Sequence, residues 1–148
     1  MSPRPVILLL LLAVLAGGCA IVSPAGSRGP LVTVESRGGE CFKAPCGSKI
    51  AIERDGRVHR MAPDAAEMYV LPADAVAALD GAIRATDFAV LKSKPFTGEC
   101  PVNFDGQEVI YEFAAPSGLE RIASCEIEID LGHPLFVAVE AALSGPPS

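Results

Sequence analysis

A run of ten consecutive apolar residues, Val6–Leu15, follows the single positive charge of Arg4 near the N-terminus. The run is too short to span the roughly 30 Å hydrocarbon core of a bilayer as a helix, and small residues follow it at once. This arrangement is typical of an export signal, so we expect residues 1–18 to be removed. The domain is then expected to fold outside the cytoplasm, in a compartment where disulfides persist.

The end of this segment resembles the lipobox of bacterial lipoproteins, in which small residues precede a cysteine that is lipidated. The matching residues are 15–19, LAGGC, with Ala16 where Leu is usual. The resemblance implies a lipid anchor on Cys19, and Ala20 rather than Asp after it implies an outer-membrane protein facing the periplasm. A small-x-small site at residues 18–20 also suits an ordinary signal peptidase, so a soluble periplasmic or secreted protein is the alternative.

Four further cysteines remain once Cys19 is set apart, and an even number in a short exported chain predicts two disulfides. They are Cys41, Cys46, Cys100 and Cys125. We favour the pairs Cys41–Cys46 and Cys100–Cys125 among the three possible connectivities. A zinc site or a redox-active pair is the alternative, but both are typically built on a C-x-x-C motif, which these spacings do not contain.

Removal of the signal leaves 130 residues, enough for a single domain. The net charge becomes −7 instead of −6, because Arg4 is lost. An acidic chain without a basic patch or any Trp is not expected to bind nucleic acid. Residues 19–30 read as a Ser/Pro/Gly tether, residues 31–143 as the folded α+β domain, and residues 144–148 as a disordered tail.

Alternating apolar residues predict strands in the first half of the domain. Leu31–Arg37 alternates valines with Thr and Glu, and Lys49–Glu53 alternates again. Val58–Met61 is expected to return beside it, because Asp55-Gly56 between them is a hairpin-turn signal.

The period changes to that of a helix over Pro72–Thr86, where Val76, Leu79 and Ile83 fall on one stripe. Pro72 suits the first helical turn. The next apolar residues are expected to enter the core: Phe88, Val90 and Leu91.

The last third predicts a hairpin followed by a helix. Gln107–Phe113 and Leu119–Ile129 are rich in strand-forming residues and are joined by a turn-forming linker, and Pro134–Leu143 begins with a proline suited to a helix start. The expected fold is α+β: a small, mostly antiparallel sheet packed by one main helix and a short C-terminal helix, with two disulfides.

The segment CFKAPCGSKIAIERDGRV resembles a bacterial exported domain family of unknown function. That family shows a CFxxCP motif, an alternating strand, a DG turn, a helix ending in Phe and a β-hairpin, an order matched here over Cys41–Cys125. Four residues instead of three separate the first two cysteines, and Gly47 stands where the family has Pro. The resemblance implies this order of elements and no activity, so it transfers no functional residue.

Acidic residues alternate near the end of the predicted hairpin. Glu126, Glu128 and Asp130 are expected to project from one strand face, where they are weak candidates for binding a hard cation or a basic partner. A solvated strand face is the simpler interpretation. His133 follows and is expected to cap the last helix, and His59 is expected at the surface.

Three classes of function fit these patterns. The leading one is a non-enzymatic binding or inhibitor-like module that contacts a protein partner through the loops Gly38–Ser48 and Lys92–Gly106. The second is a structural envelope lipoprotein without a discrete site. The third is a small enzyme or cation-binding protein using the acidic residues and His133. We expect no cofactor and no catalytic residue, because no nucleophile–base pair, phosphate loop or dinucleotide motif can be assembled.

Overall fold

The computed structural model describes residues 29–40 and 46–145. The predicted signal peptide, Cys19, residues 20–28 of the tether, and Cys41 lie outside the described residues.

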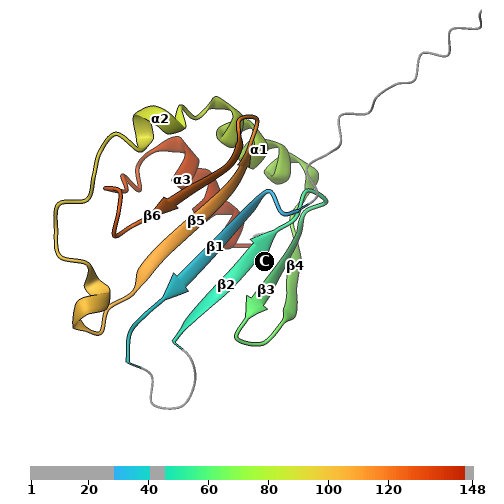
Figure 1. The fold of residues 1–148 in the computed structure, drawn as a ribbon. Helices are drawn as coiled ribbons and strands as arrows, with labels where there is room; N and C mark the ends of the chain where they lie inside the picture. Colours follow the sequence, from blue (N-terminus) through green and yellow to red (C-terminus); the bar gives the residue numbers. More distant parts are fainter. Residues whose placement is uncertain (1–28, 41–45, 146–148) are drawn as a thin grey trace, which may run out of the picture.

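Six strands of this described part form one antiparallel sheet in the order β4-β3-β2-β1-β5-β6 (Figure 1). The strands are β1 (Val32–Arg37), β2 (Gly47–Ile52), β3 (Arg57–Ala62), β4 (Ala66–Val70), β5 (Glu108–Ala115) and β6 (Gly118–Ala123). β1 is an inner strand that pairs with β2 on one side and β5 on the other. The expected α+β class with an antiparallel sheet is confirmed.

The turn between β2 and β3 lies where the Asp-Gly pair predicts it. Gly56 adopts a φ of 89°, and its amide donates a hydrogen bond to the Glu53 carbonyl at 3.0 Å. A Cβ atom on Gly56 would lie 2.7 Å from the Leu71 carbonyl oxygen, so both the backbone angle and the available space favour glycine.

Strand β4 has no counterpart among the strands expected from sequence. It pairs with β3 through a register irregularity between Val58 and His59. Met68 and Val70 on this edge strand are about half exposed. A strand with a bulged partner and exposed apolar residues lacks the clean two-residue alternation that identifies half-buried strands.

Within the described ranges three α-helices accompany the sheet: α1 (Ala73–Ala85), α2 (Phe88–Leu91) and α3 (Pro134–Leu143). α1 buries Leu79 and Ile83, as its apolar stripe predicts, and Pro72 is its N-cap rather than its first helical residue. α3 has the predicted bounds, with Pro134 in its first turn. Figure 1 shows α1 and α3 behind the sheet.

The hydrophobic core lies between these helices and one face of the sheet. Val32, Ile52, Val58, Phe113 and Ile122 reach it from five strands. The helices contribute Leu79, Ile83, Leu135, Phe136 and Val139 to the same cluster. In the part of the chain that the structure describes, no helix covers the opposite face, which we call the open face (Figure 1).

Two expectations about the elements that follow α1 and β5 are wrong. Val90 is 62% exposed instead of buried, because the short helix α2 turns only Phe88 and Leu91 toward the core. Strand β6 ends at Ala123 rather than Ile129, because a turn follows in which the Ala123 carbonyl accepts the amides of Glu126 and Ile127.

One of the two expected disulfides, Cys100–Cys125, is present, with its Cα atoms 5.1 Å apart. It joins the loop before β5 to the turn after β6. The other expected bridge, Cys41–Cys46, involves Cys41 and so lies outside the described residues. The structure therefore bears out one bridge of the two.

Candidate functional site

The three acidic residues expected on one strand face are not brought together. Because β6 ends early, Glu126 lies in a turn, where both of its carboxylate oxygens accept from Arg121 Nη1 at 2.9 Å. Ile127 and Ile129 still pack against the core, as the alternation predicts. Glu128 and Asp130 lie farther along, beside a cavity of about 180 Å³ that does not include Glu126.

That cavity does bring Asp130 and His133 together, along with Asp87, Lys94 and Phe136. Its polar groups serve local backbone structure. His133 Nδ1 accepts the amide of Leu135 at 3.2 Å, which confirms the expected capping of α3. Asp130 accepts the amide of Gly132 at 2.9 Å, and Asp87 caps α2.

A cation site is not assembled at this cavity. Within residues 29–40 and 46–145, no group of three His, Cys, Asp or Glu side chains has the arrangement needed to hold a metal ion. His59, the other histidine, lies 34% exposed on β3 with its Nε2 3.1 Å from a Glu53 carboxylate oxygen.

The described start of the first loop expected to bind a partner meets the second loop at one end of the sheet. After β1 the chain passes Gly38 and Gly39, which lie against the 3₁₀ helix η1 (Pro101–Phe104). A Cβ on Gly38 would lie 2.9 Å from Val102 Cγ2, so glycine permits this close approach. We call the surface formed by residues 38–39 and 101–105 the η1 end.

The η1 end is held in shape by several contacts. The Cys100 carbonyl accepts the Asn103 amide at 3.0 Å, and the Pro101 carbonyl accepts the Gly106 amide at 2.8 Å. The Cys100–Cys125 bridge fixes the start of η1 to the β6 turn. On this braced turn, Phe104 is 64% exposed and Val102 is 39% exposed.

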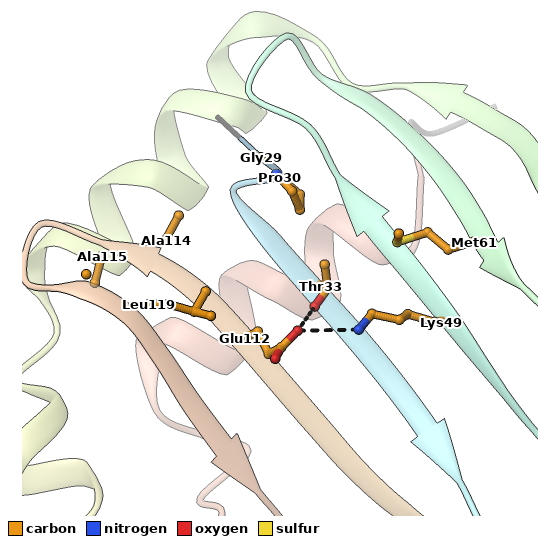
Figure 2. Close-up of a pocket in the computed structure, with 10 residues that line it drawn as sticks. Gly29, Pro30, Thr33, Lys49, Met61, Glu112, Ala114, Ala115 and Leu119 are labelled. Atoms are coloured by element: carbon orange, nitrogen blue, oxygen red, sulfur yellow. Dashed lines mark hydrogen bonds and ion pairs between the residues drawn. The ribbon is translucent and has the colours of Figure 1, made fainter. Parts of the chain in front are cut away.

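A second feature, a groove of about 510 Å³, occupies the open face at the opposite end of β1 (Figure 2). Its apolar wall contains Pro30, Met61, Ala114, Ala115 and Leu119. The volume falls within the range of roughly 300–1,000 Å³ that is typical of ligand pockets.

The polar part of the groove is a short chain of contacts across three strands. Thr33 Oγ1 donates to Glu112 Oε2 at 3.0 Å, and Lys49 Nζ lies 3.4 Å from the same oxygen. Lys49 also lies 3.3 Å from Glu35 Oε2. Burial acts to lower the pKa of Lys49, but hydrogen bonds and attraction from Glu35 and Glu112 outweigh it and raise the pKa.

The sequence patterns do not predict this groove. Thr33, Glu35 and Lys49 alternate with core residues in strands that the sequence predicts, so the pattern places all three side chains on the face opposite the core. Their contact with Glu112 depends on β1 pairing with β5, far away in the sequence, and on the register that places Thr33 opposite Glu112. A pattern within one strand contains neither fact.

None of the helices in the described ranges is both long and apolar enough to cross a membrane. Comparison of the chain with protein-family models, curated protein sequences and solved structures finds no match to any of the three.

Proposed function

We propose that the chain is an exported, non-enzymatic binding module, anchored through a lipid on Cys19, that contacts a protein of the cell envelope through its η1 end. The observation that carries the proposal is Phe104, an aromatic side chain 64% exposed on a braced turn. Exposed aromatic residues on well-ordered turns are typical anchors of protein interfaces.

Rigidity of the η1 end supports binding. Two backbone hydrogen bonds close the turn, and Asp105 holds a left-handed conformation with a φ of 59°. A surface that is already ordered loses less conformational entropy when a partner binds.

Charge around the η1 end indicates the kind of partner. Glu99 and Asp105 are exposed near Phe104 along the chain, and the exposed Glu40 follows Gly39, which lies against Asp105. An apolar centre with an acidic rim fits a protein that offers an apolar pocket edged by Lys or Arg, since complementary charge favours the correct encounter.

The position of the η1 end also suits an anchored protein. The chain enters the domain at Leu31 and crosses the sheet along β1, which leads to Gly38 at the other end (Figure 1). Six residues of strand span roughly 20 Å. A membrane anchor preceding Leu31 would leave the η1 end facing away from the lipid surface.

The non-enzymatic part of the proposal is based on the cavity that contains Asp130 and His133. His133 Nδ1, Asp130 and Asp87 each accept a nearby backbone amide, so all three serve as helix or turn caps. General acid–base catalysis instead requires a side chain aimed at a substrate proton.

Photo-crosslinking in intact cells tests the proposal. A photoreactive amino acid replaces Val102, and a matched control carries it at Val90, which is 62% exposed on α2. We expect a discrete protein adduct from position 102, none from position 90, and loss of the adduct when Phe104→Ser is added. Equal capture at both positions, or capture that survives Phe104→Ser, would contradict it.

A further inference from the structure

We infer that the groove on the open face binds a small amphiphilic amine, with its apolar body against Ala114 and Leu119 and its ammonium group at Glu112. This inference is independent of the η1 end, which lies at the other end of β1.

The apolar half of the inference comes from the groove walls. Met61 is 47% exposed and Leu119 is 72% exposed, on strands β3 and β6 respectively. Between them the floor is low, because Thr33 and Ala114 are small side chains (Figure 2). An apolar body lying against Ala114 would cover the exposed side chain of Leu119, which the hydrophobic effect favours.

The cationic half comes from Glu112. Its Oε2 atom accepts from Thr33 and contacts Lys49, whereas its Oε1 atom makes no hydrogen bond or ion pair with any residue that the structure describes. Arg121, directly opposite Glu112 on β6, is engaged with Glu126 instead. Glu112 therefore retains one oxygen that can accept from a ligand ammonium group.

The net charge around Lys49 also favours a cationic ligand. Lys49 lies between two carboxylates, those of Glu35 and Glu112, so the three groups together carry a charge of about −1 at neutral pH. An anionic head approaching Lys49 would meet both carboxylates. A cationic head gains their attraction and a charge-assisted hydrogen bond.

Binding of three probes that share one apolar body tests the inference. Phenylbutylamine, phenylbutanol and phenylbutyrate are titrated into the exported full chain carrying Cys19→Ser, and amide shifts are followed by NMR. We expect the amine to bind most tightly and to shift amides around Thr33 and Ala114. Equal affinity for the three probes, or tighter binding of the carboxylate, would overturn the inference.

Variants then assign the two halves of the site. We expect Glu112→Gln and Leu119→Ser each to weaken amine binding about tenfold, a loss of the size expected for a charge-assisted hydrogen bond or a large apolar contact. Val90→Ser, which removes another exposed apolar residue, on α2, should leave the affinity unchanged. Glu35→Gln removes one negative charge without altering the groove lining and should weaken the amine but not the alcohol. Unchanged amine affinity in Glu112→Gln, or in Glu35→Gln if the first variant does not fold, would refute the inference.

Discussion

Thr33 and Glu112 face each other across β1 and β5, and the Thr33 hydroxyl donates to the Glu112 carboxylate at 3.0 Å. Thr33 is only 7% exposed, although no helix in the described part of the chain covers its face of the sheet. A buried hydroxyl is stabilising only while its hydrogen bond is made. This pair therefore links the stability of the sheet centre to the groove.

Replacing Thr33 by Val should lower the free energy of unfolding by about 1 kcal/mol, because the shape is kept and one hydrogen bond is lost. Thr33→Ser is the matched control: it keeps the hydroxyl and loses a methyl group. Urea denaturation of both variants measures the difference. A Val variant as stable as the parent would show that the hydrogen bond contributes nothing.

Two glycines should respond in opposite directions to alanine. Gly56→Ala places a Cβ 2.7 Å from the Leu71 carbonyl oxygen at a φ of 89°, so we expect a loss of about 1–3 kcal/mol. Gly81 in α1 has open space around its Cβ position, so Gly81→Ala should add about 1 kcal/mol of stability. Thermal denaturation of the two variants measures both changes in stability. A change in the same direction for both would contradict the different roles given to these glycines.

Loss of the Cys100–Cys125 bridge should destabilise the domain by about 3 kcal/mol, since the bridge closes a loop with a sequence separation of 25. The double variant Cys100→Ser/Cys125→Ser, compared with the parent under non-reducing conditions, measures this loss by chemical denaturation. Equal stability of the two proteins would mean that the bridge does not constrain the unfolded chain.

Glu120 should make stability depend on acid pH. The hydrogen bond from Lys92, at 2.5 Å, and then that from Ser117 lower the pKa of Glu120 below its ordinary value of 4.5. A lowered folded-state pKa gives a stabilising contribution that is complete above pH 4.5 and is lost as the pH falls through the folded-state pKa.

The measurement is the difference in unfolding free energy between the parent and Glu120→Gln across that acidic range. We expect the difference to be largest above pH 4.5 and to shrink as the pH is lowered. A difference that does not vary with pH would refute the coupling.

The proposed anchor has a direct test in fractionation. Cys19→Ser removes the thiol to which the proposed lipid would be joined, so the protein should move from the membrane fraction to the soluble fraction. Ala20→Ser, one residue later, is a control that leaves the cysteine in place. Continued membrane association of the Cys19→Ser variant would exclude a lipid on this residue.

Local patterns predicted most of the fold where a segment's own residues determine its structure. α3 has its expected bounds because Pro134 starts it and its apolar residues recur at helical spacing. The Asp55-Gly56 turn followed from its dipeptide. The sequence pattern does not predict β4, because its partner strand carries a bulge. It predicts too long a strand for β6, because the turn at Ser124–Glu126 does not interrupt the alternation of Ile127 and Ile129.

The candidate sites were less predictable, because each depends on pairing between distant segments. The sequence predicts which loops would contact a partner, but the exposure of Phe104 depends on how η1 packs against Gly38. The groove requires the order β3-β2-β1-β5-β6 and the register within it. The alternation of acidic residues before His133 predicts that they share one face of a strand. Because β6 ends at Ala123, Glu126 is instead separated from Glu128 and Asp130.

The place of β1 within the sheet has a mechanical consequence. Any force transmitted through the chain that precedes Leu31 acts along the axis of a strand hydrogen-bonded on both sides, to β2 and to β5. Since the hydrogen bonds of antiparallel strands run perpendicular to the strand axis, such a pull loads both ladders in shear, and their bonds must fail together instead of one after another. The proposed anchor would therefore pull on a strand whose two hydrogen-bond ladders resist the force together.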